Sequence, residues 1–415
     1  MDDRRTLLVR VAGRDRPGIT AALLDVIAAA GVDVYDMEQV TTRDRLTLDL
    51  LLGLPDGGAR SASADAVLKD LLFLGWERDL HVDFEPIEPQ PPAPPQPRHA
   101  VTVIGQPLTA AALGAVARAT AQAGANIDRI FRLSRYPVVS YELAVSGGDL
   151  DRLRAGLFEA SQQHAVDVAV QREGLERRAK RLVVVDVDST LIQDEIIELL
   201  AAAVGRQAEV REITARAMAG QVDFADALRE RVALLAGLEA AELERVRGEV
   251  RLTPGARTLV RTLKRLGYRL GIVSGGFTFF TDALRVELGL DHAVANQLEV
   301  VDGRVTGRLI GRLVDRAVKA DVLEEIARRE GVPLEQTVAI GDGANDLDML
   351  ARAGLGVAFN AKPLVRQAAD TSLTVPYLDA VLFLLGIRRD EVDAADAQEL
   401  PDRPPQVPVP GTPPV

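Results

Sequence analysis

The chain has 415 residues, which exceeds one ordinary domain and suffices for about two to four, each with a core of its own. Its 47% hydrophobic and 27% charged residues are typical of a soluble globular protein, and a formal net charge of -12 disfavours nucleic acid and anionic membranes as partners. The absence of cysteine excludes disulfides, thiol catalysis and thiolate zinc sites. The N-terminal residues resemble neither a signal peptide nor a membrane span, so we expect a cytoplasmic protein.

Residues 1–85 carry the patterns of a small α+β domain. A strand-like run, TLLVRVAG, precedes the helical run GITAALLDVIAAAG and two more strand-like runs, VDVYDMEQV and LTLDLLLGL. A helix over residues 62–74 and a strand over 81–84 complete the order βαββαβ. Residues 86–98 then hold seven prolines in thirteen positions, which predicts an extended linker.

The βαββαβ order returns over residues 99–172, with helices predicted near 110–123 and 149–161. The string Gly31-Val32-Asp33-Val34 is echoed by Gly124-Ala125-Asn126-Ile127 at an offset of 93, which indicates an internal duplication. Both units are therefore predicted to be ferredoxin-like α+β domains.

The turn Asp15-Arg16-Pro17-Gly18 follows the first strand of the first unit. Tandem βαββαβ units with this turn resemble ACT domains, which bind amino acids and regulate metabolic enzymes. The resemblance implies an amino-acid effector near Asp15 and Gly18, and serine is the candidate. In the second unit the turn reads Gly105-Gln106-Pro107-Leu108, without the glycine after proline. The alternative is that both units serve only as dimerisation surfaces, and in either case the resemblance implies a homodimer or larger homo-oligomer.

Three predicted strands of the C-terminal half end in polar loops. The apolar run before Asp186-Val187-Asp188-Ser189-Thr190 predicts a buried parallel strand, and two further strands end in Ser274-Gly275-Gly276 and Gly341-Asp342-Gly343-Ala344-Asn345-Asp346. Lys319 lies near the start of a predicted helix between the last two loops. Ligands of open α/β sheets bind at the carboxyl ends of the strands, so these loops predict one site for a phosphate.

Together, these four motifs resemble the haloacid dehalogenase superfamily of phosphohydrolases over residues 180–388. The resemblance implies an α/β fold with a Rossmann-like parallel sheet, and a reaction in which Asp186 forms an aspartyl-phosphate. Asp188 would be the general acid and base. Mg²⁺ is the implied cofactor, held by Asp186, Asp342 and the backbone carbonyl of Asp188, with Asp346 holding its waters.

The same resemblance assigns the groups that bind the phosphoryl oxygens. They are Ser274, the amide of Gly275 and Lys319, with Asn345 adding a hydrogen bond.

Between the first two motifs lies a largely helical stretch, predicted to be a small cap over about residues 194–252. This stretch is similar to the cap of the phosphoserine phosphatase family. The similarity implies that Glu195 pairs with the substrate ammonium, that Arg231 holds its carboxylate, and that Met218 and Phe224 form an apolar wall. It implies hydrolysis of O-phospho-L-serine, the last step of serine biosynthesis, with feedback by serine through the ACT units.

Other interpretations stay open at this point. Phosphothreonine, phosphohomoserine or a phosphorylated protein segment could also be substrates, although a protein segment lacks the free charges for Glu195 and Arg231. The chain could instead be an amino-acid sensor with a degenerate phosphatase domain. Residues 389–415 are acidic and then proline-rich, which predicts a disordered tail.

Overall fold

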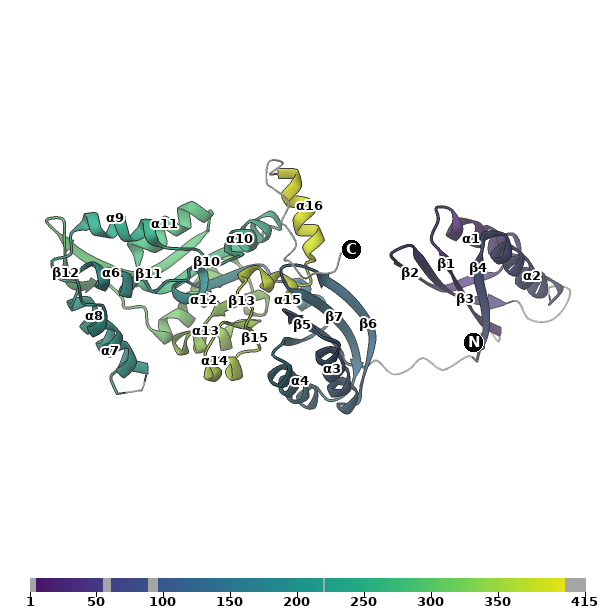
Figure 1. Cartoon of the computed structure of the whole chain (residues 1–415), viewed down its shortest axis with the longest axis horizontal. Coiled ribbons are helices and arrows are strands. Elements are labelled where there is room, and N and C mark those ends of the chain that lie inside the picture. The colour runs from purple at the N-terminus through teal and green to yellow at the C-terminus, as the bar shows by residue number, and fades with distance from the viewer. Residues whose placement is uncertain (1–4, 55–60, 89–95, 219–220, 400–415) are drawn as a thin grey trace. The chain divides into compact units, whose positions relative to one another are not determined.

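The computed structural model describes residues 5–54, 61–88, 96–218 and 221–399. The chain forms two compact units, which divide between residues 95 and 96 (Figure 1). Within the described ranges, no helix is both long and apolar enough to cross a membrane.

The N-terminal unit has the predicted βαββαβ order. Its elements are β1 (Arg5–Arg14), α1 (Ile19–Ala29), β2 (Asp33–Thr42), β3 (Arg45–Leu54), α2 (Ser61–Arg78) and β4 (Leu80–Ile87). The strands form an antiparallel sheet in the order β2-β3-β1-β4. Leu48, Leu50 and Leu52 alternate along β3 and are fully buried in one cluster with Leu23 of α1 and Leu71 of α2. This alternation with period two is why the sheet has one face covered by helices.

The second βαββαβ unit belongs to the larger compact unit. Its elements are β5 (Arg98–Gly105), α3 (Ala110–Gln122), β6 (Ala125–Ser134), β7 (Val139–Gly147), α4 (Leu150–His164) and β8 (Asp167–Arg172). The sheet order, β6-β7-β5-β8, repeats that of the first unit, which confirms the predicted fold of both. Val101 and Val103 of β5 face α3 and α4, whereas Ile104 joins the core of the C-terminal domain. The second sheet is therefore covered on both faces.

The C-terminal domain is built on a seven-stranded sheet in the order β12-β11-β10-β9-β13-β14-β15. The paired strands are parallel except for β12, which runs antiparallel to β11. Its strands are β9 (Leu182–Asp186), β10 (Arg269–Phe277), β11 (His292–Val301), β12 (Arg304–Ile310), β13 (Thr337–Gly341), β14 (Gly356–Phe359) and β15 (Thr371–Leu373). The predicted Rossmann-like sheet is confirmed, and the antiparallel strand at its edge is an addition.

Helices cover both faces of this sheet. They and the short turns are α5 (Leu175–Arg178), η1 (Val187–Leu191), α10 (Ala256–Arg265), α11 (Thr278–Leu288), α12 (Arg316–Glu330), η2 (Leu334–Gln336), η3 (Ala344–Asp346), α13 (Leu347–Arg352), α14 (Pro363–Ala368), η4 (Leu378–Ala380), α15 (Val381–Leu384) and α16 (Arg389–Glu399). Val183 and Val185 of β9 lie in the cluster that contains α10, whereas Leu182 and Val184 lie in the cluster of α12. Burial on both faces explains why β9 is apolar until Asp186.

Four helices are inserted between η1 and α10. They are α6 (Ile196–Ala203), α7 (Gln207–Met218), α8 (Phe224–Ala233) and α9 (Ala240–Glu249), and they form the helical cap (Figure 1). Leu200 of α6, Val232 of α8 and Val246 of α9 are fully buried in the core cluster of the domain. The cap is thus packed as part of this domain.

The second βαββαβ unit is joined to the C-terminal domain by a buried carboxylate. Asp167 of β8 is 3% exposed and accepts hydrogen bonds from the backbone N–H of Thr374, at 2.7 Å, and from its hydroxyl, at 2.8 Å. The backbone N–H of Val375 donates to the same carboxylate at 3.3 Å. Gln171 of β8 also donates to the carbonyl of Leu384, so β8 is bound to two segments of the domain.

Asp167→Ala is expected to lower the free energy of unfolding by about 2–4 kcal/mol, because it leaves buried donors without an acceptor. The measurement is calorimetric melting of the full chain. Asp151→Ala, which changes an exposed carboxylate of α4 in the same unit, is the matched control. Equal melting temperatures for the two variants would contradict this account of the contact.

The structure corrects one prediction and leaves part of another outside the described residues. The predicted disordered tail is wrong for Arg389–Glu399, which form α16. Asp396 of this helix pairs with Arg261 and Arg265 of α10, and Val392 is buried. The prediction failed because it counted apolar residues and ignored these ion pairs. In the predicted linker, β4 ends at Ile87 and β5 begins at Arg98, while residues 89–95, like residues 400–415, lie outside the described residues.

Candidate active site

The three predicted strand ends meet at one edge of the sheet. Strand β9 lies between β10 and β13, with Asp186 opposite Val273 of β10 and Val185 opposite Ile340 of β13. Because the three strands are parallel, the residues that follow them emerge at the same edge. The structure thus brings Asp186, Ser274 and Asp342 together from segments far apart in the sequence.

A buried lysine joins two of the carboxylates at this edge. Lys319 of α12 is 1% exposed, and its Nζ donates to Oδ1 of Asp186 at 2.6 Å and to Oδ1 of Asp346 at 2.7 Å. Burial alone would lower the pKa of Lys319, but the two carboxylates outweigh it and raise the pKa above its usual range. Lys319 is therefore a fixed positive charge beside Asp186.

Asp186, Asp342 and Asp346 form a cluster of carboxylates. One oxygen of each lies within 4.8 Å of the others, an arrangement suited to a divalent cation. Burial raises the pKa of Asp186, as do the neighbouring carboxylates, led by Asp346, against the opposing effect of Lys319. Burial and the Asp346 carboxylate raise the pKa of Asp342 to about 6. The set has more negative charge than Lys319 alone compensates, and its hard oxygen donors fit Mg²⁺.

The carboxylate of Asp188 is held apart from this cluster. It accepts hydrogen bonds from the backbone N–H of Ile196 at 2.8 Å and from the hydroxyl of Ser274 at 2.9 Å. Burial raises its pKa, and these two hydrogen bonds oppose the rise. A raised pKa brings this carboxyl group closer to the range in which a general acid and base works.

Ser274 is itself fixed within the last part of β10, where the pairing with β11 shifts register. Its Oγ accepts from the backbone N–H of Gly276 at 2.7 Å, and the side chain is fully buried. The carbonyl of Gly275 accepts from the Asn296 side chain of β11 at 2.8 Å, which holds this segment in place. Asn345 lies half-buried in η3, next to Asp346.

The cap carries the charged pair expected to recognise the substrate. Glu195 precedes α6 and accepts from the hydroxyl of Ser189 at 2.7 Å. Burial and the nearby Asp188 raise its pKa to about 7. Arg231 of α8 is 9% exposed and donates to the carbonyl of Ala227 at 3.2 Å and to the hydroxyl of Thr214 at 3.3 Å. Burial lowers the pKa of Arg231, and Glu195 is the leading carboxylate that opposes this shift, so the two charges lie close enough to attract one another.

One of the two predicted wall residues can be placed. Phe224, half-buried at the start of α8, comes within 3.7 Å of the position that a Cβ on Gly275 would occupy. The cap thus reaches the phosphate loop. The side chain of Met218, at the end of α7, lies outside the described residues.

Sequence reasoning missed three residues that hold the site in shape. The hydroxyl of Thr190 donates to Oδ1 of Asp342 at 3.0 Å, and Ser189 orients Glu195 from a backbone φ of 57°. Both stand within the Asp-x-Asp-Ser-Thr motif, so the motif itself carried the signal. The third, Asn296, directly follows the apolar run Ala293-Val294-Ala295 in β11 and is buried, and no pattern in the sequence indicated its hydrogen-bonding role.

Comparisons with known proteins agree with this geometry. Residues 183–351 match the haloacid dehalogenase-like hydrolase family, and residues 5–85 and 97–171 each match an ACT domain. The phosphoserine phosphatase of Streptomyces coelicolor is 57% identical over 406 residues, which cover 97% of this chain and 98% of that protein. The chain belongs to the phosphoserine phosphatase family. Phosphoserine phosphatase SerB2 of Mycobacterium tuberculosis is 48% identical over 400 residues, covering 96% of this chain and 97% of the relative.

A solved structure supports the same membership in the phosphoserine phosphatase family. The unliganded probable phosphoserine phosphatase from Vibrio cholerae is 35% identical, with a TM-score of 0.56, and the match covers 72% of this chain and 89% of that one. As a member of the family, the chain is a phosphatase preceded by two ACT domains.

The candidate effector residues lie in the first ACT domain. Gly18 precedes α1 with a φ of 91°, a conformation that glycine adopts without strain, and its side-chain position is open. Asp15 is exposed and accepts a hydrogen bond from Thr41 at 3.4 Å, while its backbone N–H donates to the carbonyl of Asp44. The turn leaves its backbone accessible from solvent.

Proposed function

We propose that the chain hydrolyses O-phospho-L-serine to L-serine and inorganic phosphate, the last step of serine biosynthesis. The observation that carries this proposal is the buried Asp186, bonded to Lys319 and clustered with two other carboxylates, together with the cap residues Glu195 and Arg231 near Asp188. A carboxylate nucleophile needs a neighbouring positive charge before it can approach a phosphate dianion. A zwitterionic amino acid needs one negative and one positive partner, and the cap offers both.

Asp186 and Asp342 would hold Mg²⁺, with the backbone carbonyl of Asp188 as a further oxygen donor. When bound, the cation supplies positive charge that screens the phosphate from the carboxylates. The sequence resemblance implied that Asp346 binds the metal's water molecules. The Asp346 carboxylate belongs to the same cluster, and its bond to Lys319 is compatible with that role.

The side chains then divide the reaction between them. Asp186 attacks phosphorus and forms an aspartyl-phosphate, which splits one difficult displacement into two easier ones. Asp188 donates a proton to the serine oxygen as it leaves and later takes a proton from the attacking water. Ser274, the amide of Gly275, Lys319 and Asn345 bind the phosphoryl oxygens and stabilise charge in the transition state.

Glu195 and Arg231 set the substrate class. Glu195 pairs with the ammonium, Arg231 with the carboxylate, and Phe224 and Met218 enclose the carbon atoms between them. Phosphothreonine and phosphohomoserine carry the same two charges and are the closest competitors. A phosphoprotein lacks both charges and fits least well.

The test is phosphate release from O-phosphoserine, other phosphorylated amino acids, phosphosugars and phosphopeptides, each with Mg²⁺ and with EDTA. We expect O-phosphoserine to give the highest kcat/KM and EDTA to abolish release. Equal activity on phosphosugars would contradict the assignment of O-phosphoserine as the substrate, although the protein would still be a phosphatase.

Glu195 gives this proposal a pH dependence. Its pKa of about 7 means that it loses its charge, and with it the attraction for the ammonium, as the pH falls below 7. KM for O-phosphoserine is therefore expected to rise about tenfold between pH 8 and pH 6. Glu195→Gln should have a high KM throughout this range. A wild-type KM that does not depend on pH would contradict the role of Glu195.

We further propose that serine binds near Asp15 and Gly18 and lowers the activity, and that the protein is a homodimer or larger homo-oligomer formed through its ACT domains. Support comes from the open turn at Gly18 and the fully exposed edge strand β2. Steady-state rates and sedimentation with millimolar serine test both points. A cytoplasmic location stays a prediction.

A further inference from the structure

Two linkers join the cap to the sheet domain, and they are paired with one another. Residues 191–195 lead into the cap and residues 250–253 lead out of it. The backbone N–H of Thr253 donates to the carbonyl of Leu191 at 2.9 Å, and that of Gln193 donates to the carbonyl of Arg251 at 2.9 Å. Ile192 and Leu252 form an antiparallel bridge between these bonds. The linkers thus form a short two-stranded ribbon at the base of the cap.

Asp194 extends this ribbon by one position with its side chain. Its Oδ2 accepts from the backbone N–H of Arg251 at 2.9 Å, and its Oδ1 accepts from the Arg251 guanidinium at 2.7 Å. The Asp194 side chain is 11% exposed, whereas that of Arg251 is 68% exposed. Burial alone would raise the pKa of Asp194, but the hydrogen bonds from Arg251 outweigh it and keep the pKa below its usual value. The carboxylate is therefore ionised and bonded through both oxygens.

The residue that follows this clamp is Glu195. Its backbone lies between the ribbon and the first turn of α6, where its carbonyl accepts from Glu198 and Leu199. Its side chain is oriented by Ser189, whose own backbone N–H donates to the carbonyl of Asp194 at 3.4 Å. Asp194 is thus the chain neighbour of Glu195 and is also hydrogen-bonded to Ser189, the residue that orients the Glu195 side chain.

We propose that Asp194 and Arg251 are positioning residues for Glu195, so that selection for the substrate ammonium depends on this pair. The inference rests on the proposed function, in which Glu195 binds that ammonium. A carboxylate displaced by even about 1 Å loses much of a charge-assisted hydrogen bond, whereas Ser274 and Lys319 are held by other segments. The backbone N–H of Ile196, which holds Asp188, belongs to the first turn of α6 and, among the described residues, makes no hydrogen bond with the Asp194 side chain. The pair should therefore affect recognition of the ammonium much more than phosphoryl transfer.

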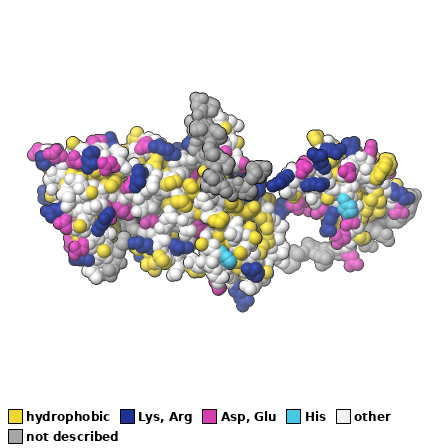
Figure 2. All heavy atoms as spheres, viewed as in Figure 1, with side chains coloured by type: hydrophobic (Ala, Val, Ile, Leu, Met, Phe, Trp, Pro, Cys, Tyr) yellow, Lys and Arg dark blue, Asp and Glu magenta, His cyan; other side chains and the backbone are white. Residues whose placement is uncertain are grey.

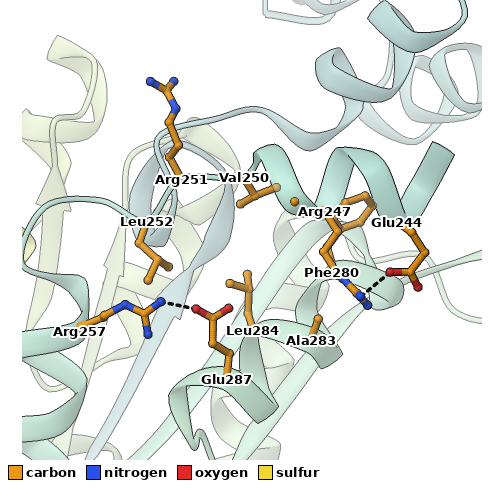
Figure 3. Close-up of a pocket in the computed structure, with 11 residues that line it drawn as sticks. Glu244, Arg247, Val250, Arg251, Leu252, Arg257, Phe280, Ala283, Leu284 and Glu287 are labelled. Atoms are coloured by element: carbon orange, nitrogen blue, oxygen red, sulfur yellow. Dashed lines mark hydrogen bonds and ion pairs between the residues drawn. The ribbon is translucent and has the colours of Figure 1, made fainter. Parts of the chain in front are cut away.

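The surrounding surface provides a matched control. Figure 3 shows a pocket lined by Leu252, Phe280 and Leu284, with the guanidinium of Arg251 directed away from it. Arg257 lines the same pocket, is 58% exposed and pairs with Glu287 (Figure 3). Among the described residues Arg257 makes no hydrogen bond or ion pair to residues 191–195. Arg257→Gln thus removes a similarly exposed guanidinium without touching the ribbon.

The experiment measures kcat and KM of the full chain, with Mg²⁺, on three substrates. O-phosphoserine has both charges, O-phosphoethanolamine has the ammonium alone, and 3-phosphooxypropanoate has the carboxylate alone. Asp194→Ala is expected to lower kcat/KM about tenfold for the two ammonium substrates, through KM, and to leave 3-phosphooxypropanoate within about twofold. Arg251→Gln, which keeps the backbone bond to Asp194, should show the same selectivity with a smaller loss. Arg257→Gln should match the wild type on all three.

The outcomes separate the inference from the proposed function. If Asp194→Ala loses activity equally on all three substrates, or on none, Asp194 does not position Glu195. If the wild-type enzyme still prefers the substrates with an ammonium, the proposed function stands. A wild-type enzyme that is indifferent to the ammonium would overturn both together. If Asp194→Ala does not fold, Arg251→Gln is the test, because Arg251 is exposed and its replacement should be tolerated. Wild-type selectivity in Arg251→Gln would then contradict the positioning role of the two residues.

Discussion

Asp186→Asn is expected to lower kcat by about 10⁴-fold or more, because the amide cannot attack phosphorus and no aspartyl-phosphate can form. The fold should survive, since asparagine fills the same space and removes one of three crowded carboxylates. Steady-state phosphate release, combined with a melting curve of each variant, makes the measurement.

Asp348→Asn is the matched control for this substitution. Asp348 lies on α13 in the same domain, pairs with Arg316 and is 38% exposed, so its loss should leave kcat unchanged. If Asp186→Asn kept more than about a hundredth of the wild-type rate, another group would have to be the nucleophile. A loss of turnover in Asp186→Asn would also exclude the interpretation of the chain as an amino-acid sensor alone, because a sensor without enzymatic activity has no turnover to lose.

Lys319→Met is expected to have the largest effect on stability. The lysine is 1% exposed and bonded to Asp186 and Asp346, so removing it leaves buried carboxylates without their cation. Breaking a buried ion pair in this way costs about 3–5 kcal/mol. Urea unfolding of the full chain in EDTA at pH 8 should show the loss, and activity should fall with it.

The pH dependence of this variant identifies the cause. Carboxyl groups with a raised pKa in the folded state, such as Asp342 at about 6, destabilise that state once they ionise. Their contribution to stability is present at low pH and is lost as the pH rises through the folded-state pKa. Lys319→Met should therefore regain stability between pH 8 and pH 5, and adding Asp346→Asn should regain part of it at pH 8. A loss of stability that is the same at both pH values would point to lost packing instead.

Much of the fold could be predicted from local patterns. The repeated βαββαβ order and the turn at residues 15–18 identified both ACT domains, and the apolar run of β9 identified a buried parallel strand. The antiparallel β12 and the helix α16 were not predicted. Helix α16 depends on ion pairs between Asp396 and two arginines of α10, which lie more than a hundred residues earlier in the sequence. Composition alone cannot show such pairing.

The sequence by itself determined which residue types would carry the chemistry, because four motifs in order, each at a predicted strand end or helix start, together resemble one family of phosphohydrolases. Only the tertiary structure decided how they are joined. It placed Lys319 between Asp186 and Asp346, turned the Asp188 carboxylate toward Ser274, and brought Arg231 within electrostatic reach of Glu195.

The same distinction holds for the support of the site. Asp194 and Arg251 are 57 residues apart and the sequence assigned neither a role, yet the ribbon at the base of the cap brings them into contact beside Glu195. The physical reason is that charge, burial and hydrogen-bond partners depend on distances between segments, whereas a sequence pattern reports only the propensity of each segment.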